Sequence, residues 1–203
     1  PCRWFHSLFS ICNRTHPPKE SIAFMEIWKN SELVFVGKVV ALRTGEVRLD
    51  DGSEAYREVV EHPGGVCILP FTGQAFVLVK QFRIALGKDM IEAPAGKLEV
   101  NETPLQCAVK ELHEETGYRA DRLISLGVIH HSVGFCSEAI HLFLALDLTE
   151  IGQKLEKDER IEMLHVPLEE ASALACSESL QDAKTVVILN RALAWLSARK
   201  EEI

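Results

Sequence analysis

Apolar residues recur along this chain in two patterns, one typical of strands and the other of helices. Short apolar or alternating runs bounded by turn residues predict strands over residues 33–42, 46–49, 55–61, 66–70, 75–81, 89–93, 123–131, 138–148 and 161–166. Apolar residues three and four positions apart predict helices over residues 104–116, 168–177 and 182–200. Because strands and helices are mixed without regular alternation, the pattern predicts an α+β fold around a mixed sheet.

The helix over residues 104–116 has the clearest boundaries. Thr103 suits the N-cap, Pro104 suits the first helical position, and Gln106 completes a Thr-x-x-Gln capping box. Gly117 supplies a left-handed stop at the other end. Four apolar residues at helical spacing are expected to face the core: Leu105, Ala108, Val109 and Leu112.

Three glutamates gather beside that apolar stripe. Glu111, Glu114 and Glu115 share one arc of the helix, where like charges three and four positions apart repel one another. A hard divalent cation such as Mg²⁺, which prefers carboxylate oxygens, would remove this repulsion. For a helix taken alone, a solvated acidic face is the commoner explanation, so the helix by itself leaves both interpretations open.

Turn residues divide the chain into parts. Asp51-Gly52 predicts a hairpin turn, and Thr44-Gly45 predicts a turn between two strands. The run Pro63-Gly64-Gly65 breaks the pattern and predicts a boundary. The expected parts are a tail over residues 1–20, an antiparallel β-arm over residues 21–62 and a main domain over residues 63–203. The tail carries no acidic residue before Glu20 and is expected to be flexible rather than a targeting segment.

Composition narrows the function classes. A chain of 203 residues can bury a sizeable core, and its net charge of −8 argues against nucleic-acid binding, which needs clustered cations. A phosphate-bearing substrate would therefore need local arginines or a metal. The six cysteines are scattered without a C-x-x-C pair, which predicts a reduced cytoplasmic protein, and no apolar run reaches the length of a membrane span.

A longer motif surrounds the glutamates. Gly96, Glu102 and the run from Lys110 to Tyr118, KELHEETGY, resemble the signature of the Nudix hydrolases: a glycine, a glutamate, then Arg-Glu-aliphatic-x-Glu-Glu-x-Gly-aliphatic. So many fixed positions at fixed spacing argue strongly against a chance match. Lys110 stands where the family usually has arginine, and Tyr118 where it has an aliphatic residue. Lysine keeps the positive charge but lacks the rigid bidentate fork.

The resemblance extends to the ADP-ribose pyrophosphatase branch of that family. The segments that carry it are residues 56–65 (YREVVEHPGG), 80–83 (KQFR), 91–96 (IEAPAG) and 132–138 (SVGFCSE), with a weaker similarity at 182–185. Val133 departs from the branch, which usually has proline there. The resemblance implies an α/β/α sandwich around a mixed sheet, with an N-terminal β-arm that crosses to a second subunit of a homodimer.

The implied reaction is hydrolysis of the diphosphate in a nucleoside diphosphate sugar. The leading candidate is ADP-ribose, which would give AMP and ribose 5-phosphate. Such a substrate carries negative charge where the nucleophile must attack, so the chemistry needs cations. The resemblance implies that Mg²⁺ or Mn²⁺ is held by Glu111, Glu115 and the carbonyl of Ala95. Glu114 would be a further ligand, directly or through water, and belongs to the catalytic group. Glu102 would support the motif by pairing nearby.

Four residues are expected to bind the substrate: Arg57, Arg83, Glu92 and Gly134. Arg83 follows a predicted strand, where a guanidinium can fork onto phosphate oxygens. Glu92 could accept a hydrogen bond from the substrate, or it could be a solvated carboxylate at a strand end. Phe35 and Tyr56 could stack on the adenine, although core packing is the better interpretation for either one alone.

Glu138 is the expected catalytic carboxylate outside the helix. The three helix glutamates are committed to cations, so a protein base must come from elsewhere if one acts. Glu138 lies in a loop with Gly134 that looks mobile and could close over substrate. Two alternatives stay open: a metal ligand, which the resemblance also implies at this position, or a carboxylate on the loop surface. His130 and His131 invite a general-base role, but a histidine pair at a strand end is more often structural.

Two other functions stay open. The same chemistry could act on a different nucleoside diphosphate sugar, such as GDP-mannose, because base and sugar contacts come from variable loops. A non-catalytic ligand sensor on the same fold would need a degraded motif or an added DNA-binding domain, and the 55 residues beyond Leu148 leave little room for such a domain.

Overall fold

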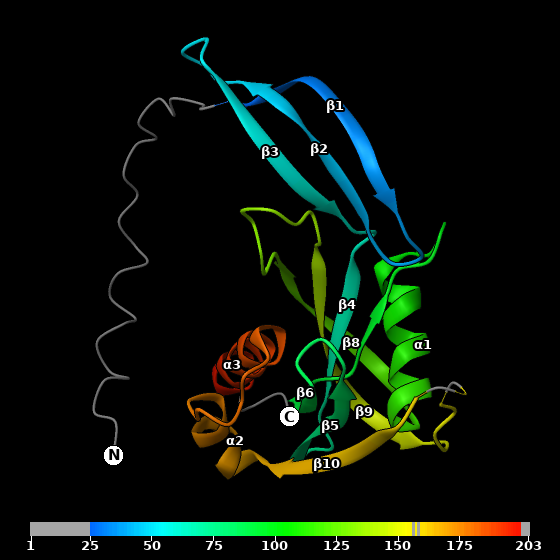
Figure 1. Cartoon of the computed structure of the whole chain (residues 1–203). Coiled ribbons are helices and arrows are strands. Elements are labelled where there is room, and N and C mark those ends of the chain that lie inside the picture. The colour runs from blue at the N-terminus through cyan, green and yellow to red at the C-terminus, as the bar shows by residue number, and fades with distance from the viewer. Residues whose placement is uncertain (1–24, 156, 158, 200–203) are drawn as a thin grey trace. The chain divides into compact units, whose positions relative to one another are not determined.

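The computed structural model describes residues 25–155, 157 and 159–199 (Figure 1). The chain forms two compact units. The first unit contains the described residues up to Ser31 together with Gly45–Arg57, and the second contains Glu32–Thr44 and the described residues from Glu58 onward. The tail expected over residues 1–20 lies outside the described part of the chain.

The first three strands of the described chain form one sheet, in the order β1-β2-β3. They are β1 (Ile27–Val36), β2 (Ala41–Arg48) and β3 (Glu54–Glu61). The single strand predicted over residues 33–42 is wrong, because a turn closed by Gly37 N–H on Val40 C=O (2.9 Å) separates β1 from β2. The turn predicted at Thr44-Gly45 is also wrong, since both residues lie inside β2.

The Asp51-Gly52 turn is confirmed. Leu49 N–H donates to Ser53 C=O at 2.9 Å, and Gly52 has a φ of 85°, which glycine adopts without strain. Glycine is required at position 45 for a different reason, because a Cβ there would lie 2.2 Å from the carbonyl oxygen of Asn30 in β1. The glycine at position 45 is therefore explained by the close packing of β1 against β2, and not by a turn.

Two further sheets build the second unit. One has the order β7-β4-β9-β8 and the other β10-β5-β6. Their strands are β4 (Gly65–Pro70), β5 (Ala75–Arg83), β6 (Lys88–Glu92), β7 (Ala95–Lys97), β8 (Tyr118–Ile129), β9 (Ile140–Glu150) and β10 (Ile161–Pro167). Strands β4 and β9 are parallel, whereas the neighbouring pairs β4–β7 and β8–β9 are antiparallel. The mixed sheet is thus confirmed, and only the three-residue β7 was not predicted.

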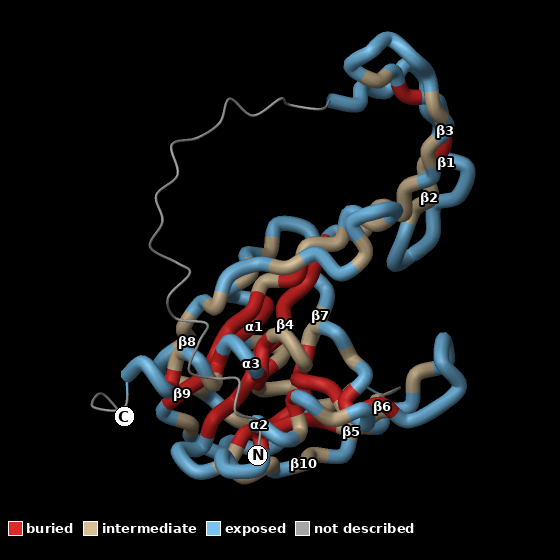
Figure 2. The backbone as a smooth tube through the Cα atoms, turned by 90° about the vertical axis from the view of Figure 1, so that its left-hand side faces the viewer, coloured by how far each residue is buried: buried red, intermediate tan, exposed pale blue. Residues whose placement is uncertain are grey.

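Helices cover both faces of the four-stranded sheet. They are α1 (Pro104–Thr116), α2 (Leu168–Ala175) and α3 (Ala183–Ala198), with α1 on one side of the strands and α2 and α3 on the other (Figure 1). Along β4, Cys67 and Leu69 join the cluster that contains α3, while Val66 and Ile68 join the cluster that contains α1. A strand buried on both faces reads as a continuous apolar run. Figure 2 shows the buried backbone concentrated where these layers meet.

Helix α1 confirms the predicted caps and half of the predicted core face, since Ala108 and Leu112 are buried. The Thr103 side chain accepts from Gln106 N–H, Gln106 reaches back to Thr103, and Gly117 has a φ of 70°. Leu105 and Val109, expected in the core, are 52% and 51% exposed. The residues that α1 buries are Cys107, Ala108, Leu112, Glu115 and Thr116.

The buried arc of α1 is rotated by about 50° from the predicted one, at about 100° per residue. This shift brings Glu115 inside and turns Val109 outward. The apolar pattern alone could not indicate this rotation, because burying a carboxylate normally costs free energy and a helix face that contains one is not expected to face the core.

The remaining secondary structure follows the prediction closely. Helices α2 and α3 and strand β10 lie where the pattern placed them, and Asp182 caps α3 by accepting from Thr185 N–H. Between β9 and β10, residues 156 and 158 lie outside the described part of the chain. Among the helices described, none is long and apolar enough to cross a membrane.

The position of the core face of α1 can be tested by stability. Leu112→Ala removes a side chain that is 1% exposed, and we expect a loss of about 2–5 kcal/mol in the free energy of unfolding. Leu105→Ala, on the exposed side of the same helix, is the matched control and should change this free energy by no more than about 0.5 kcal/mol. Urea unfolding of both variants measures the difference, and equal losses would contradict the rotated face.

Candidate active site

The site begins where α1 meets the short strand β7. Ala95 N–H donates to Glu115 Oε2 at 3.0 Å. Ala95 is held in place because it pairs with Cys67 in the buried strand β4. Glu115 is only 4% exposed, so its carboxylate is fixed between the helix and the strand.

Gly96 makes room for the second glutamate. A Cβ on Gly96 would lie 2.0 Å from the carboxyl carbon of Glu111, a separation that no side chain tolerates. On the other side, a Cβ on Gly65 would lie 2.7 Å from the Gly96 carbonyl oxygen. The two glycines thus let β4, β7 and α1 approach closely enough to bring Glu111 and Glu115 to the same edge.

Burial makes these two carboxylates hard to ionise. It raises the pKa of Glu115 to about 8 and the pKa of Glu111 to about 7. The Ala95 N–H opposes the rise at Glu115, and Lys110 opposes it at Glu111, where the neighbouring Glu114 adds to it. A carboxyl group whose pKa is raised by folding destabilises the fold above the pKa that it has in the unfolded chain. The loss of stability grows with pH until the pH reaches the raised pKa of the folded state.

The donor set fits a hard divalent cation. The buried carboxylate of Glu115 and the half-buried one of Glu111 lie at one edge, and Glu114 adds negative potential. Together they offer the oxygen ligands that Mg²⁺ and Mn²⁺ prefer. Such a cation would stabilise the charged forms that burial disfavours. The residues predicted as ligands are therefore compatible with the chemistry of the ion, although their ligation stays a prediction.

Lys110 organises the surroundings of this edge. Its Nζ lies 3.1 Å from Glu99, 3.2 Å from Glu102 and 3.6 Å from Glu111. Glu102 also accepts the N–H of Glu99 at 3.0 Å, so it closes the loop that leads into α1. The ammonium group of Lys110 therefore interacts with three carboxylates as a point charge. This arrangement does not require the planar, bidentate guanidinium of an arginine.

A second cluster joins Arg83 to the start of α3. Arg83 donates from Nε and Nη2 to the two oxygens of Glu92, at 2.6 and 2.9 Å. Lys184 Nζ also contacts Glu92, at 2.5 Å, and Asp182, at 3.0 Å. Burial opposes the charge on Glu92, but the two cations hold its pKa below the ordinary value.

This cluster revises the interpretation of Glu92. The carboxylate is 4% exposed, so the alternative of a solvated strand end is wrong. Both of its oxygens are occupied by the cations of Arg83 and Lys184. A direct contact of Glu92 with substrate stays a prediction, and its observed role is to hold two cations.

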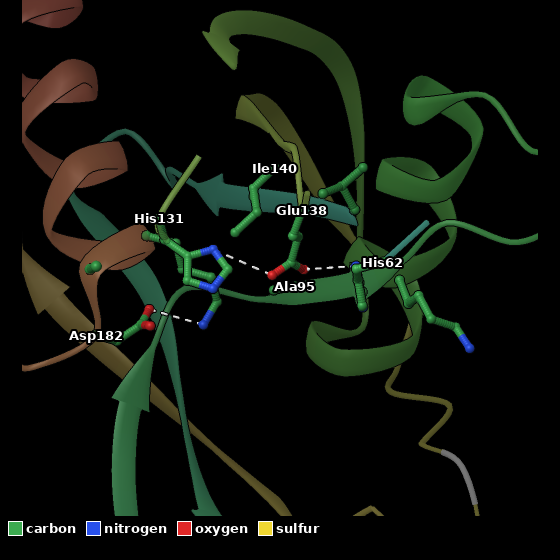
Figure 3. Close-up of a pocket in the computed structure, with 11 residues that line it drawn as sticks. His62, Ala95, His131, Glu138, Ile140 and Asp182 are labelled. Carbon is green, nitrogen blue, oxygen red and sulfur yellow. Dashed lines mark ion pairs between the residues drawn. The ribbon is translucent and has the colours of Figure 1, made fainter. Parts of the chain in front are cut away.

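Glu138 lies between two histidines in the loop after β8. Its Oε1 is 3.2 Å from His62 Nδ1 and its Oε2 is 3.3 Å from His131 Nδ1 (Figure 3). His130 Nδ1 lies 3.0 Å from the Glu138 carbonyl oxygen, so it can donate to the backbone. The Gly64 N–H also points to His62 Nδ1 at 3.1 Å, and the tautomer of His62 decides which of its two partners it serves.

The loop that carries Glu138 is anchored. Val60 N–H donates to Phe135 C=O at 2.7 Å, and Ser137 N–H donates to Val60 C=O at 3.0 Å. These two bonds flank Cys136 and fix the loop to the end of β3. The loop is therefore anchored on the side of Cys136, while Gly134 is exposed and a Cβ there would meet no atom within 4 Å. Closure of the loop over substrate stays a prediction.

A cavity of about 260 Å³ unites these elements. Ala95 forms part of its wall, and Glu138 and the two histidines line another part (Figure 3). Gly96 and Lys184, the latter from α3, also line it. The complete lining is His62, Val66, Ala95, Gly96, Lys97, His131, Glu138, Ile140, Asp182, Ala183 and Lys184. The cavity thus combines a cation, Lys184, with a candidate base, Glu138, and its Ala95-Gly96 wall is the segment that Glu111 and Glu115 contact.

Other predicted residues lie away from this cavity or in the first unit. Arg57 belongs to the first unit and donates to both oxygens of Glu26, at 2.8 and 2.7 Å. Its contact with substrate stays a prediction. Phe35 and Tyr56 are 56% and 60% exposed, so the preferred expectation that each packs in a core is wrong for the single chain.

Lys184 and His62 were not predicted as site residues. Lys184 contacts Glu92 across 92 positions of sequence, and no local pattern indicates such a pair. The sequence similarity at residues 182–185 was the one available signal for Lys184. His62 precedes the Pro63-Gly64-Gly65 break, which suggested a boundary and not a function.

Comparison with known proteins places these observations in a family. The model of the NUDIX domain matches residues 61–187. The chain is 43% identical over 157 residues to the ADP-ribose pyrophosphatase of Bacillus subtilis, covering 76% of this chain and 85% of that protein. It is 38% identical to the methanol dehydrogenase activator of Bacillus methanolicus, covering 81% and 90%. It is 36% identical to the GDP-mannose pyrophosphatase of Citrobacter koseri, covering 66% and 75%.

A solved structure supports the same fold. The crystal structure of an ADP compounds hydrolase superposes with a TM-score of 0.77 at 19% identity, covering 86% of this chain and 95% of that one. Together, the domain match across more than half of the chain and the relatives above 30% identity show that this chain is a member of the NUDIX family of hydrolases.

Proposed function

We propose that this protein hydrolyses the diphosphate bond of a nucleoside diphosphate sugar with the help of Mg²⁺ or Mn²⁺. The leading candidate substrate is ADP-ribose, which would be cleaved to AMP and ribose 5-phosphate. The observation that carries the proposal is the convergence of the buried Glu115 and the half-buried Glu111 on Ala95-Gly96, a segment that lines the same cavity as Lys184 and Glu138. The similarity to an ADP-ribose pyrophosphatase supports the choice of substrate.

The metal would be held by Glu111, Glu115 and the carbonyl of Ala95, with Glu114 as a further ligand. When bound, such a cation screens the charge of a diphosphate and makes water a better nucleophile at neutral pH. The residues of this chain supply the rest. Gly96 and Gly65 leave the space in which the two glutamates converge.

Positive side chains orient the phosphates in this mechanism. Lys184 lines the cavity, and Arg83 is joined to it through Glu92. Because both cations are already held in place, little rotamer freedom is lost when a phosphate oxygen binds them. Arg57 is proposed as a second arginine for the substrate.

Glu138 would take the proton of the attacking water. Its carboxylate is half-buried and its two oxygens are contacted by His62 and His131, which restrict its rotation (Figure 3). A base positioned in this way contributes about 10²–10⁴-fold to the rate of a proton-transfer step. Gly134 is proposed to border the substrate from the same loop.

A different nucleoside diphosphate sugar is the second candidate substrate. The similarity to GDP-mannose pyrophosphatases favours it specifically. Release of AMP from ADP-ribose, compared with release of GMP from GDP-mannose at equal concentrations, distinguishes the two. A non-catalytic sensor would release neither product.

Removal of the metal should abolish turnover. Clustered carboxylates cannot stabilise a diphosphate transition state without a cation, so excess EDTA should stop AMP release and added Mg²⁺ should restore it. Glu115→Gln should lose most activity while its amide oxygen still accepts the Ala95 N–H and keeps the fold. Glu99→Gln, at an exposed carboxylate, is the control and should keep its activity. Undiminished activity in EDTA would sink the proposed mechanism.

The role of Glu138 is tested by its amide variant. Glu138→Gln should lower kcat by about 10²–10⁴-fold with little change in substrate affinity. Glu162→Gln, at a well-exposed carboxylate paired with Lys80, is the matched control. Stopped assays of both variants measure the effect. If Glu138→Gln stays within about threefold of the parent kcat, Glu138 is a surface carboxylate and no base.

We also propose a homodimer in which the arm over residues 21–62 contacts the second subunit. All ten residues of β1 are exposed in the single chain, including Ile27, Val34, Phe35 and Val36. Apolar exposure of this extent is typical of a surface that another protein covers. Sedimentation equilibrium should give the mass of a dimer, and Phe35→Glu should shift it towards the monomer. A fully active monomer of the parent chain would refute this arrangement.

A further inference from the structure

Three side chains with metal-binding atoms meet in the loop between β8 and β9. They are His131, Cys136 and Glu138, and one ligand atom from each lies within 4.8 Å of the other two. In this group, His131 Nδ1 and Glu138 Oε2 are 3.3 Å apart. The oxygen ligands proposed for Mg²⁺ belong to β7 and α1, so this cluster is a separate set of donors.

The spacing suits a tetrahedral ion after small side-chain rotations. With Zn–N near 2.0 Å and Zn–S near 2.3 Å, ligand atoms of a tetrahedral site are about 3.3–3.6 Å apart. The His131–Glu138 pair already has this separation, and the Cys136 sulfur, which lies within 4.8 Å of both, needs to approach by at most about 1.3 Å. Three protein ligands leave one position for water or a phosphate oxygen.

The backbone holds the three residues in this arrangement. Cys136 N–H donates to Ser132 C=O at 2.9 Å, which closes a turn over the residues between His131 and Cys136. Cys136 also forms an isolated parallel bridge with Val60, and Ser137 N–H donates to Val60 C=O at 3.0 Å. A site whose ligands are already ordered loses less conformational entropy when an ion binds.

The donors are chemically selective and accessible. Cys136 is a free, half-buried thiol, and His131 is exposed, so an ion can enter from solvent. Thiolate and imidazole suit Zn²⁺, whereas Mg²⁺ prefers oxygen ligands alone. His62 contacts Oε1 of Glu138, the oxygen that His131 does not contact, and can keep that carboxylate oriented.

We propose that His131, Cys136 and Glu138 form a second metal site, selective for Zn²⁺ over Mg²⁺. On binding, the thiol of Cys136 releases its proton to solvent and His131 ligates as the neutral imidazole. The ion takes the Glu138 carboxylate away from the attacking water, and Zn²⁺ therefore inhibits hydrolysis. The binding site stands on geometry alone, whereas the inhibition rests on the proposed role of Glu138.

Cobalt gives a spectroscopic test of binding. Co²⁺ replaces Zn²⁺ in such sites, and a thiolate ligand produces a charge-transfer absorption in the near ultraviolet. Titration of the whole chain with Co²⁺, in excess Mg²⁺ and without thiol reductant, should develop this band at one equivalent, and Zn²⁺ should bleach it. Cys136→Ser should abolish the band, while Cys176→Ser, at an exposed free cysteine elsewhere, should keep it.

Inhibition gives an independent readout. Cys136→Ser should retain the Mg²⁺-dependent rate and its thermal stability, because serine fits the same space. Its sensitivity to Zn²⁺ should fall by at least about 10- to 100-fold, the loss seen in metal affinity even when a residue that only orients a ligand is removed. Cys176→Ser should be inhibited like the parent.

The outcomes separate the two claims. A band of equal intensity in Cys136→Ser, or Co²⁺ binding without any thiolate band, would overturn the site. A thiolate band that depends on Cys136 together with no inhibition by Zn²⁺ would support the site and argue against Glu138 as the base.

Discussion

The close contact between α1 and the edge Ala95-Gly96 is the constraint on which the site depends. It needs a glycine at position 96, because the Glu111 carboxylate occupies the space of a side chain there. It also needs the Ala95 N–H to face the carboxylate of Glu115. Burying two carboxylates costs free energy, and apolar packing on both faces of β4 and β9 offsets it. The fold thus holds in place an arrangement that the glutamates would not adopt in water.

The sequence predicts the fold well where local chemistry decides it. The caps of α1, the Asp51-Gly52 turn and the buried strands β4 and β5 are all indicated by neighbouring residues, and the structure confirms them. The motif from Gly96 to Tyr118 identifies the family. These features depend on contacts within a few positions of the chain, which a pattern can record.

Other features depend on contacts that no pattern records. Leu105 and Val109 are exposed because the buried face of α1 includes the charged residue Glu115, against hydropathy. Gly45 resembles a turn residue, but the approach of Asn30 requires it. Lys184 reaches Glu92 from the far end of the chain. In each case the deciding neighbour is distant in sequence, so local periodicity indicates the wrong face, the wrong turn or nothing.

The cluster of Arg83, Glu92, Lys184 and Asp182 has a consequence for how this protein can change. It contains two cations and two carboxylates, and Glu92 is shared by both cations. Loss of one charge would leave an uncompensated partner in a buried or half-buried place, which is far more damaging than loss of a complete pair. Substitutions at these four positions are therefore coupled, and viable variants should accumulate there in pairs that keep the total charge constant. A protein that acquires a different preference for phosphate-bearing substrates through this cluster must pass through such paired steps.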